Sequence, residues 1–229
     1  MAGGQQLLRA DRETDATLAE STRADVERTA LGAVDVCDVV VLSDYGKGVL
    51  SDDTIASLIG RARASGKPVI VDPKGNNFSR YCGADVVTPN CAELADAAAM
   101  VVDDEDSILV ASRKLISDFG IKSILVTRSH EGMSLIDATG ARHVEVKAQE
   151  IFDVSGAGDT VVAAFSAAIA VGIEPLDAVS LANVAAGVVV GKVGTAAVYG
   201  DDLINALHSD RLYSSDAKIM PESAALEKV

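Results

Sequence analysis

Tryptophan is absent from this 229-residue sequence, and aromatic residues make up only 3% of it. A folded core must therefore consist mainly of aliphatic side chains, which a hydrophobic content of 48% can supply. Cysteine is rare as well, because Cys37, Cys82 and Cys91 are the whole set and no two of them form a CxxC pair. This set does not predict a disulfide framework, and we interpret the three as packed, reduced thiols of a cytoplasmic protein.

Positive charge is also scarce, since 20 lysines and arginines stand against 34 aspartates and glutamates and the net charge is −14. This balance argues against nucleic acid or an anionic membrane as a partner, because both bind to a basic surface. A small phosphorylated substrate needs only a local positive pocket. No apolar run approaches the ~20 residues of a membrane-spanning helix, and no signal peptide opens the chain. We therefore expect a soluble, cytoplasmic protein.

Short apolar runs rich in β-branched residues alternate with longer helical patterns, and together they predict a parallel sheet covered by helices. The predicted strands are 38–45, 68–74, 84–90 and 123–129. The predicted helices are 51–66, 104–120 and most of 157–208. The alternating pattern of 133–148, with a turn at 138–140, predicts a β-hairpin at the end of this series.

The stretch IFDVSGAGDT, residues 151–160, ends at the start of a predicted helix and combines two glycines with two aspartates. The first N–H groups of a helix lack intrahelical partners and can bind an anion, and glycines let a phosphate approach them closely. Asp159 would repel that anion, so it suits a neighbouring hydroxyl whose proton it could accept. A tight turn with Asp159 as a helix cap is the alternative. Neither the P-loop pattern nor the dinucleotide fingerprint GxGxxG is present.

Three predicted strands end in polar residues, and ligand sites of open α/β sheets gather at such ends. TPNCAEL (88–94) sets Asn90 and Glu93 one helical turn apart, where they could hold Mg²⁺ directly or through water. The same pair could form a capping box, and the two roles can coexist. The other two ends carry Asp72 and Lys74 in VDPKG, and Thr127 and Gly132 in LVTRSHEGM, the latter pair suited to nucleotide contact.

DVSGAGDTVVAAF (153–165) resembles the C-terminal signature of the ribokinase-like (PfkB) carbohydrate kinase family. The resemblance implies a three-layer α/β/α fold with a mainly parallel central sheet and ATP-dependent phosphorylation of a sugar hydroxyl. It implies that Asp159 is the catalytic base and that the N–H groups of Gly156, Ala157 and Gly158 form the anion hole. The implied ligands are ATP, Mg²⁺ and, in many members, K⁺. The residues implied to bind them are Asn90 and Glu93 for Mg²⁺ and phosphate, Thr127, Gly132 and Asn183 for ATP, and Asp153 with the loop near Gly194 for K⁺.

Several further segments resemble the kinase half of bacterial ADP-heptose synthesis proteins, which phosphorylate D-glycero-β-D-manno-heptose 7-phosphate at O1. These segments are QQLLRADRE (5–13), LSDYGKGVL (42–50), VDPKG (71–75) and VTRSHEGMSL (126–135). The resemblance makes Arg9, Asp11 and Lys47 candidates to bind the sugar or its 7-phosphate. A solvated surface pair and a turn lysine are the alternative for these three residues.

The resemblance implies that residues 1–208 are the C-terminal two-thirds of a kinase domain, with a lid remnant at 5–13 that could support a homodimer. The N-terminal strands, with the family's Gly-Asp and GG motifs, would then be missing from the sheet. Residues 209–229 resemble a linker, which in bifunctional members leads to a nucleotidyltransferase domain. The alternatives are a nucleotide-binding remnant without catalytic activity and another PfkB sugar kinase. A Rossmann oxidoreductase is disfavoured because no glycine fingerprint follows an early strand.

Overall fold

The computed structural model describes residues 18–146, 153–192, 194 and 196–213. Its centre is one sheet of six strands that lie side by side in chain order. The strands are β1 (Val40–Ser43), β2 (Val69–Asp72), β3 (Val86–Val87), β4 (Ser123–Thr127), β5 (Met133–Asp137) and β6 (Gly140–Val144). The first four are parallel, and β5 and β6 join antiparallel as a hairpin. The predicted strands and hairpin are thereby confirmed.

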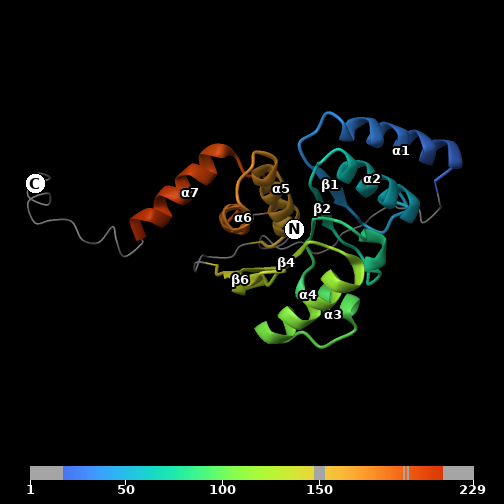
Figure 1. Ribbon diagram of the computed structural model, residues 1–229. Coiled ribbons are helices and arrows are strands. Elements are labelled where there is room, and N and C mark those ends of the chain that lie inside the picture. The colour runs from blue at the N-terminus through green and yellow to red at the C-terminus, as the bar shows by residue number, and fades with distance from the viewer. Residues whose placement is uncertain (1–17, 147–152, 193, 195, 214–229) are drawn as a thin grey trace, which may run out of the picture.

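Helices cover both faces of this sheet (Figure 1). They are α1 (Glu20–Val34), α2 (Asp52–Ala64), α3 (Cys91–Ala98), α4 (Glu105–Phe119), α5 (Ala157–Ala170), α6 (Pro175–Val190) and α7 (Gly200–Tyr213). Two short 3₁₀ turns, η1 (Phe78–Tyr81) and η2 (Ser129–Glu131), complete the set. The helical C-terminal region is confirmed, and α7 continues past residue 208, where the kinase domain was predicted to end.

Alternate side chains of the strands enter two separate cores. Val69 and Val71 pack with α2, α3 and α4 on one face, whereas Ile70 between them packs with α5 and α6 on the other. In β4, Leu125 faces the α5–α6 side and its two neighbours face the opposite side. This alternation follows from the two-residue period of a strand that is buried on both faces. The predicted three-layer α/β/α fold with a mainly parallel sheet is confirmed.

The ends of the predicted helices are set by local chemistry. Ser51 caps α2 by accepting a hydrogen bond from the N–H of Thr54 at 3.2 Å. Gly120 ends α4 in the left-handed conformation, with φ of 61°. No helix in the described ranges is long and apolar enough to cross a membrane. The segment 5–13, with Arg9 and Asp11, lies outside the described residues, as does 214–229.

Candidate active site

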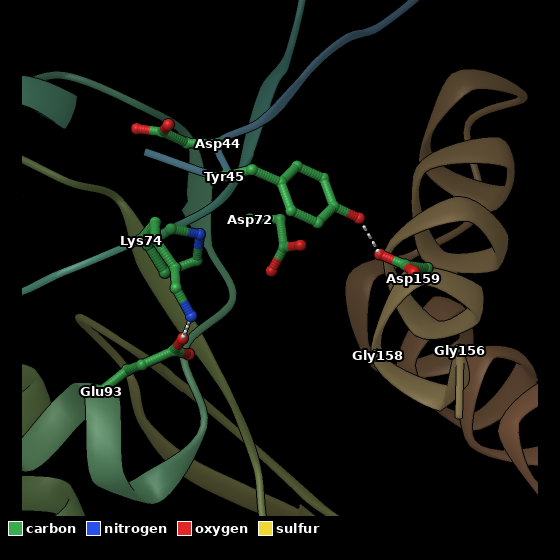
Figure 2. Close-up of a pocket in the computed structure, with 9 residues that line it drawn as sticks. Asp44, Tyr45, Asp72, Lys74, Glu93, Gly156, Gly158 and Asp159 are labelled. Atoms are coloured by element: carbon green, nitrogen blue, oxygen red, sulfur yellow. Dashed lines mark hydrogen bonds and ion pairs between the residues drawn. The ribbon is translucent and has the colours of Figure 1, made fainter. Parts of the chain in front are cut away.

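Loops that follow parallel strands meet the N-terminus of α5 around one cleft (Figure 2). β1 and β2 each lead directly into residues of its wall, and β3 reaches it through α3. This is the carboxyl edge of the sheet, where ligand sites of parallel sheets lie. The cleft has a volume of about 220 Å³. Its lining residues are Asp44, Tyr45, Asp72, Pro73, Lys74, Glu93, Gly156, Gly158 and Asp159.

The turn before α5 brings the predicted anion hole to the cleft. Gly156 is the N-cap and has φ of 80°, a left-handed conformation that favours glycine. The N–H of Ala157 donates to the carbonyl oxygen of Val154 at 3.2 Å, and Ala157 does not line the cleft. Gly156 and Gly158 do line it, so they are the donors that an anion in the cleft would approach. Asp159 follows in the same first turn.

Tyr45 reaches across the cleft to the predicted catalytic base. Its hydroxyl donates to Oδ1 of Asp159 at 2.9 Å, although the two residues are 114 positions apart in the chain (Figure 2). This hydrogen bond is the main reason that the pKa of Tyr45 is raised, so the phenol keeps its proton. The candidate residues chosen from sequence did not include Tyr45. Its place at the end of the predicted strand 38–45, between Asp44 and Gly46, was the only local signal.

Asp44 anchors the loop that carries Tyr45. Only 6% of its surface is exposed, and its carboxylate accepts hydrogen bonds from the N–H of Gly46 and the hydroxyl of Tyr81, both at 2.8 Å. The guanidinium of Arg80 completes the set at 3.2 Å. The Tyr81 hydroxyl also accepts from the N–H of Lys74 at 3.1 Å. One buried network therefore holds the loops after β1 and β2 together.

Glu93 forms the capping box that the sequence allowed and also lines the cleft. The N–H of Asn90 donates to its Oε2 at 3.1 Å, and its own N–H donates to Oδ1 of Asn90 at 2.9 Å, which completes a capping box for α3. Its other oxygen, Oε1, lies 3.8 Å from Nζ of Lys74 in the cleft. Asn90 does not line the cleft, so Glu93 is the member of this pair that faces a ligand there.

Asp72 lies between the two walls of the cleft and has a raised pKa of about 6. Burial is the main cause, and the negative charges of Glu93 and Asp159 add to it. The hydroxyl of Thr88, 3.5 Å away, opposes the rise only weakly. Four of the lining side chains are carboxylates, and Lys74 is the single cation among them. A cleft of this composition favours the binding of a cation.

We expect Asp72→Asn to stabilise the intact gene product at about pH 7 and to have little effect at about pH 4. The folded state binds the Asp72 proton more tightly than the unfolded state, so its carboxylate lowers the free energy of unfolding as the pH rises from about 4 to about 6. The rise in pKa from 3.8 to about 6 would correspond to a cost of ~3 kcal/mol, and solvent screening of the partly exposed carboxyl reduces the expected gain to ~1 kcal/mol. Urea unfolding at both pH values measures it.

The control for this experiment is Asp103→Asn, which removes the same charge from an exposed loop. The free energy of unfolding of this control should show no increase that is confined to the higher pH. An equal gain from Asp72→Asn at both pH values would contradict the role assigned to its ionisation.

The remaining predicted nucleotide residues lie outside the cleft. Thr127 ends β4 and forms an isolated parallel bridge with Asn90, so these two predicted ligands are neighbours. Gly132 is buried in the turn before β5 and has φ of 91°. Asn183, on α6, donates to the carbonyl oxygen of Glu145 at 2.9 Å, just beyond the end of β6.

The predicted K⁺ and sugar-phosphate residues take separate positions. The carboxylate of Asp153 accepts the N–H of Ser155 at 2.8 Å. This contact, the Ser155 side chain and the backbone of Gly194 keep the pKa of Asp153 below its usual value, so the two predicted K⁺ positions do lie together. Lys47 lines a second hollow of about 490 Å³ along β1, which shares Asp44 and Tyr45 with the cleft.

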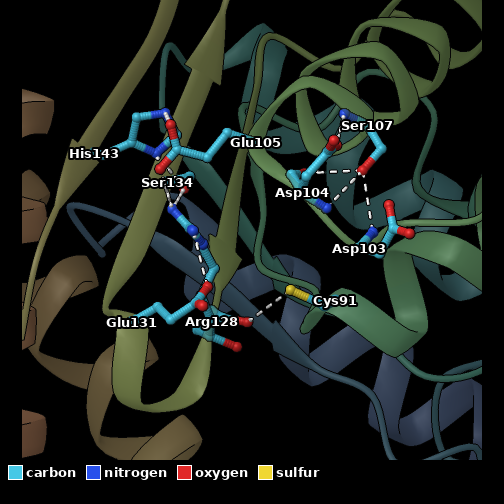
Figure 3. A network of polar contacts seen from close by, with 10 residues as sticks. Cys91, Asp103, Asp104, Glu105, Ser107, Arg128, Glu131, Ser134 and His143 are labelled. Carbon is cyan, nitrogen blue, oxygen red and sulfur yellow. Dashed lines mark hydrogen bonds and ion pairs between the residues drawn. The ribbon is translucent and has the colours of Figure 1, made fainter.

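A polar network holds the turn between β4 and β5 (Figure 3). Arg128 contacts Glu131 at 2.8 Å, Glu105 at 3.1 Å and the hydroxyl of Ser134 at 3.3 Å. The Ser134 hydroxyl in turn lies 2.6 Å from Nδ1 of His143 on β6. The network therefore links α4, the turn and both strands of the hairpin around Gly132.

Residues 5–201 of the chain match the pfkB family of carbohydrate kinases. The chain belongs to this family. Curated relatives extend the likeness to the whole sequence. Bifunctional protein HldE of Paramagnetospirillum magneticum is 51% identical over 229 residues, 100% of this chain and 47% of the relative. Bifunctional protein HldE of Rhodospirillum rubrum is 48% identical over 235 residues, 100% of this chain and 46% of the relative. The pfkB chain thus spans about half the length of these relatives.

Solved structures place the pfkB chain in the ribokinase-like fold. Phosphofructokinase-2 from Escherichia coli in complex with potassium superimposes with a TM-score of 0.74 at 21% identity, covering 85% of this chain and 63% of that one. Arabidopsis thaliana ribokinase complexed with ribose and ATP gives 0.70 at 22% identity, covering 83% of this chain and 60% of that one. The two TM-scores establish the fold. The identities are too low for the ligands of these proteins to be assigned to this chain.

Proposed function

We propose that this chain catalyses ATP-dependent phosphorylation of a sugar hydroxyl, O1 of D-glycero-β-D-manno-heptose 7-phosphate, in ADP-heptose synthesis in the cytoplasm. One observation carries the proposal. Asp159 stands in the first turn of α5, beside two glycines that line the same cleft, and already binds a neutral hydroxyl. An anion-binding helix start and a carboxylate that accepts an O–H hydrogen bond are the groups that phosphoryl transfer to an alcohol requires.

In the proposed reaction, Asp159 accepts the proton of the sugar hydroxyl as its oxygen attacks the γ-phosphorus of ATP. The bond between that phosphorus and the β–γ bridging oxygen breaks, and ADP leaves. The N–H groups of Gly156 and Gly158 would bind the transferring phosphoryl group, whose charge is further stabilised by the positive end of α5. Asp159 acts in its ionised form in this role, and in the structure its Oδ1 accepts a hydrogen bond from a neutral hydroxyl.

The acidic cleft fits a Mg²⁺ ion. Carboxylate oxygens are the ligands that Mg²⁺ prefers, and Oε1 of Glu93 is directed into the cleft while Asn90 serves as the cap of α3. In the described part of the chain no group of three or more acidic, histidine or cysteine side chains could hold a metal ion. This suits Mg²⁺, which commonly keeps waters and takes ligands from a substrate phosphate. When bound, the ion would neutralise the charge of the ATP phosphates.

The substrate assignment rests on the relatives and on candidate anion-binding residues. Both relatives described above are named bifunctional protein HldE, which supports a heptose phosphate as the acceptor and a nucleotidyltransferase as the second activity of a longer protein. Lys47 lies in the hollow next to the cleft and is our candidate for the 7-phosphate, together with Arg9 and Asp11. K⁺ at Asp153 and homodimer formation belong to the same proposal.

A sugar-dependent ADP-release assay on the intact gene product tests the proposal. ATP and Mg²⁺ are supplied with heptose 7-phosphate, and then with other phosphorylated and unphosphorylated sugars. Phosphorylation of heptose 7-phosphate at O1 supports the full proposal, whereas a clear preference for another sugar would retain the kinase and replace the acceptor. ATP binding without phosphorylation of any sugar would favour the alternative, a nucleotide-binding protein without kinase activity.

We expect Gly158→Ala to separate stability from activity. Gly158 has ordinary helical backbone, and a Cβ at this position would meet nothing within 4 Å, so alanine should stabilise α5 by ~0.5 kcal/mol. That Cβ would stand where a phosphate must approach the N–H group, so turnover should fall roughly tenfold. Gly60→Ala in α2, which also has open space, is the control and should gain stability without losing activity. Full activity of Gly158→Ala would contradict a phosphate contact at this residue.

A further inference from the structure

Tyr45 occupies one of the two carboxylate oxygens of Asp159, the group on which the proposed chemistry depends. A general base must lie within hydrogen-bonding distance of the hydroxyl that it deprotonates, about 2.6–3.2 Å. The Tyr45 hydroxyl lies 2.9 Å from Oδ1 of Asp159, within the range that an acceptor hydroxyl would need. Both groups are neutral O–H donors to this carboxylate, and they would compete for Oδ1.

Packing does not explain the position of the Tyr45 ring. Tyr45 is 55% exposed, so its ring gains little from burial. The hydrogen bonds of Asp44 nevertheless hold its loop in place. In the same loop, Gly46 and Gly48 have left-handed backbone conformations, with φ of 67° and 80°. Because the loop backbone is held in place and the Tyr45 side chain is exposed, the ring can turn aside without unfolding of the loop. The Tyr45 hydroxyl could therefore leave Asp159 while the loop stays in place.

We propose that Tyr45 covers Asp159 in the absence of sugar and keeps water from being activated there, so that ATP is not hydrolysed before the acceptor arrives. This inference rests on the proposed function. In the reaction prevented, a water oxygen bonds to the γ-phosphorus, Asp159 accepts the water proton, and the bond to the β–γ bridging oxygen breaks to release ADP and inorganic phosphate. A sugar hydroxyl displaces Tyr45 because the remainder of the sugar adds contacts that a water molecule cannot make.

The test is Tyr45→Phe in the intact gene product, with ADP release measured in the presence and absence of heptose 7-phosphate. Without sugar, we expect ADP release to rise roughly threefold or more above the wild-type rate. The KM for the sugar should fall roughly two- to tenfold, because the sugar no longer displaces a hydrogen bond, and kcat should change little. A purely structural role for Tyr45 would lower kcat and leave sugar-free hydrolysis unchanged.

Two companion variants decide how the result is interpreted. Tyr45→Phe combined with Asp159→Asn should lose the extra hydrolysis, and hydrolysis that persists would overturn the inference because Asp159 would not be its base. Tyr199→Phe removes a hydroxyl from an exposed tyrosine outside the cleft and should behave as the wild type. Unchanged sugar-free hydrolysis in Tyr45→Phe, with normal wild-type sugar phosphorylation, overturns this inference alone. A wild type that phosphorylates no sugar overturns the proposed function as well.

Discussion

Asp159→Asn is expected to lower the rate of sugar phosphorylation by about 10²–10⁴-fold, the range typical of a lost general base, while ATP affinity stays nearly unchanged. Asparagine keeps the size of the side chain and an oxygen that can accept from Tyr45, so the walls of the cleft should keep their positions. It cannot accept the proton of an attacking hydroxyl near neutral pH. Sugar-dependent ADP release measures the rate, and calorimetric titration with an ATP analogue measures the affinity.

A matched control for this variant is Asp177→Asn. Asp177 also lies in the first turn of a helix, α6, but does not line the cleft. Its replacement removes a carboxylate from a similar local environment and should leave both measurements unchanged. Equal losses of ATP affinity and turnover in Asp159→Asn would show that this carboxylate supports the nucleotide site, and the assignment of Asp159 as the base would then be wrong.

Strands and their connections were predictable because each depends on a short stretch of sequence. The β-branched run at 68–74 contains β2, and Ser51 and Gly120 mark helix ends by local hydrogen bonding and backbone conformation. The run at 84–90 is less simple, because only Val86 and Val87 form a strand. Pairing resumes at Asn90, beyond Pro89, which has no N–H to donate to a ladder.

Helix α1 was not predicted, because it has little of the apolar periodicity that identifies a helix. Only Val34 of its fifteen residues is buried. Its exposed surface carries local ion pairs, such as Glu20 with Arg23 at 2.6 Å, whose individual contributions to helix stability are small. A helix of this kind depends on its place beside α2, and that information is not contained in its own residues.

The residues of the candidate site also differ in whether local sequence or tertiary packing brings them together. Gly156, Gly158 and Asp159 lie together in the sequence, so their spacing alone predicted either an anion site beside a carboxylate or a capped turn. The contact of Tyr45 with Asp159 depends on how β1 and α5 pack across the cleft, and no local pattern encodes it. The raised pKa of Asp72 likewise results mainly from its burial, to which the carboxylates of Glu93 and Asp159 on other elements add. Sequence therefore predicted a phosphate site at the start of α5, and only the fold showed the contact of Tyr45 with Asp159.

Gly132→Ala is expected to lower the free energy of unfolding by ~3 kcal/mol, the largest stability effect that we predict. A Cβ on Gly132 would collide with the carbonyl oxygen of Val144 and lie 3.0 Å from Cα of Glu145. Both obstacles are backbone, so no side-chain rotation relieves them, and the φ of 91° adds strain for any residue with a Cβ. Relief would require β6 to move away from β5. Urea unfolding of the intact gene product, with and without ATP, measures the effect.

Gly120→Ala separates the two causes, because Gly120 shares the positive φ but a Cβ there would meet nothing within 4 Å. It should cost only ~1 kcal/mol, the conformational share of the effect. The comparison also decides between two explanations of Gly132. A glycine kept only for close approach of a nucleotide would tolerate alanine in the absence of ATP and lose ATP affinity. The collision with the β6 backbone predicts a stability loss that is present without ATP, and an unchanged unfolding midpoint would contradict it.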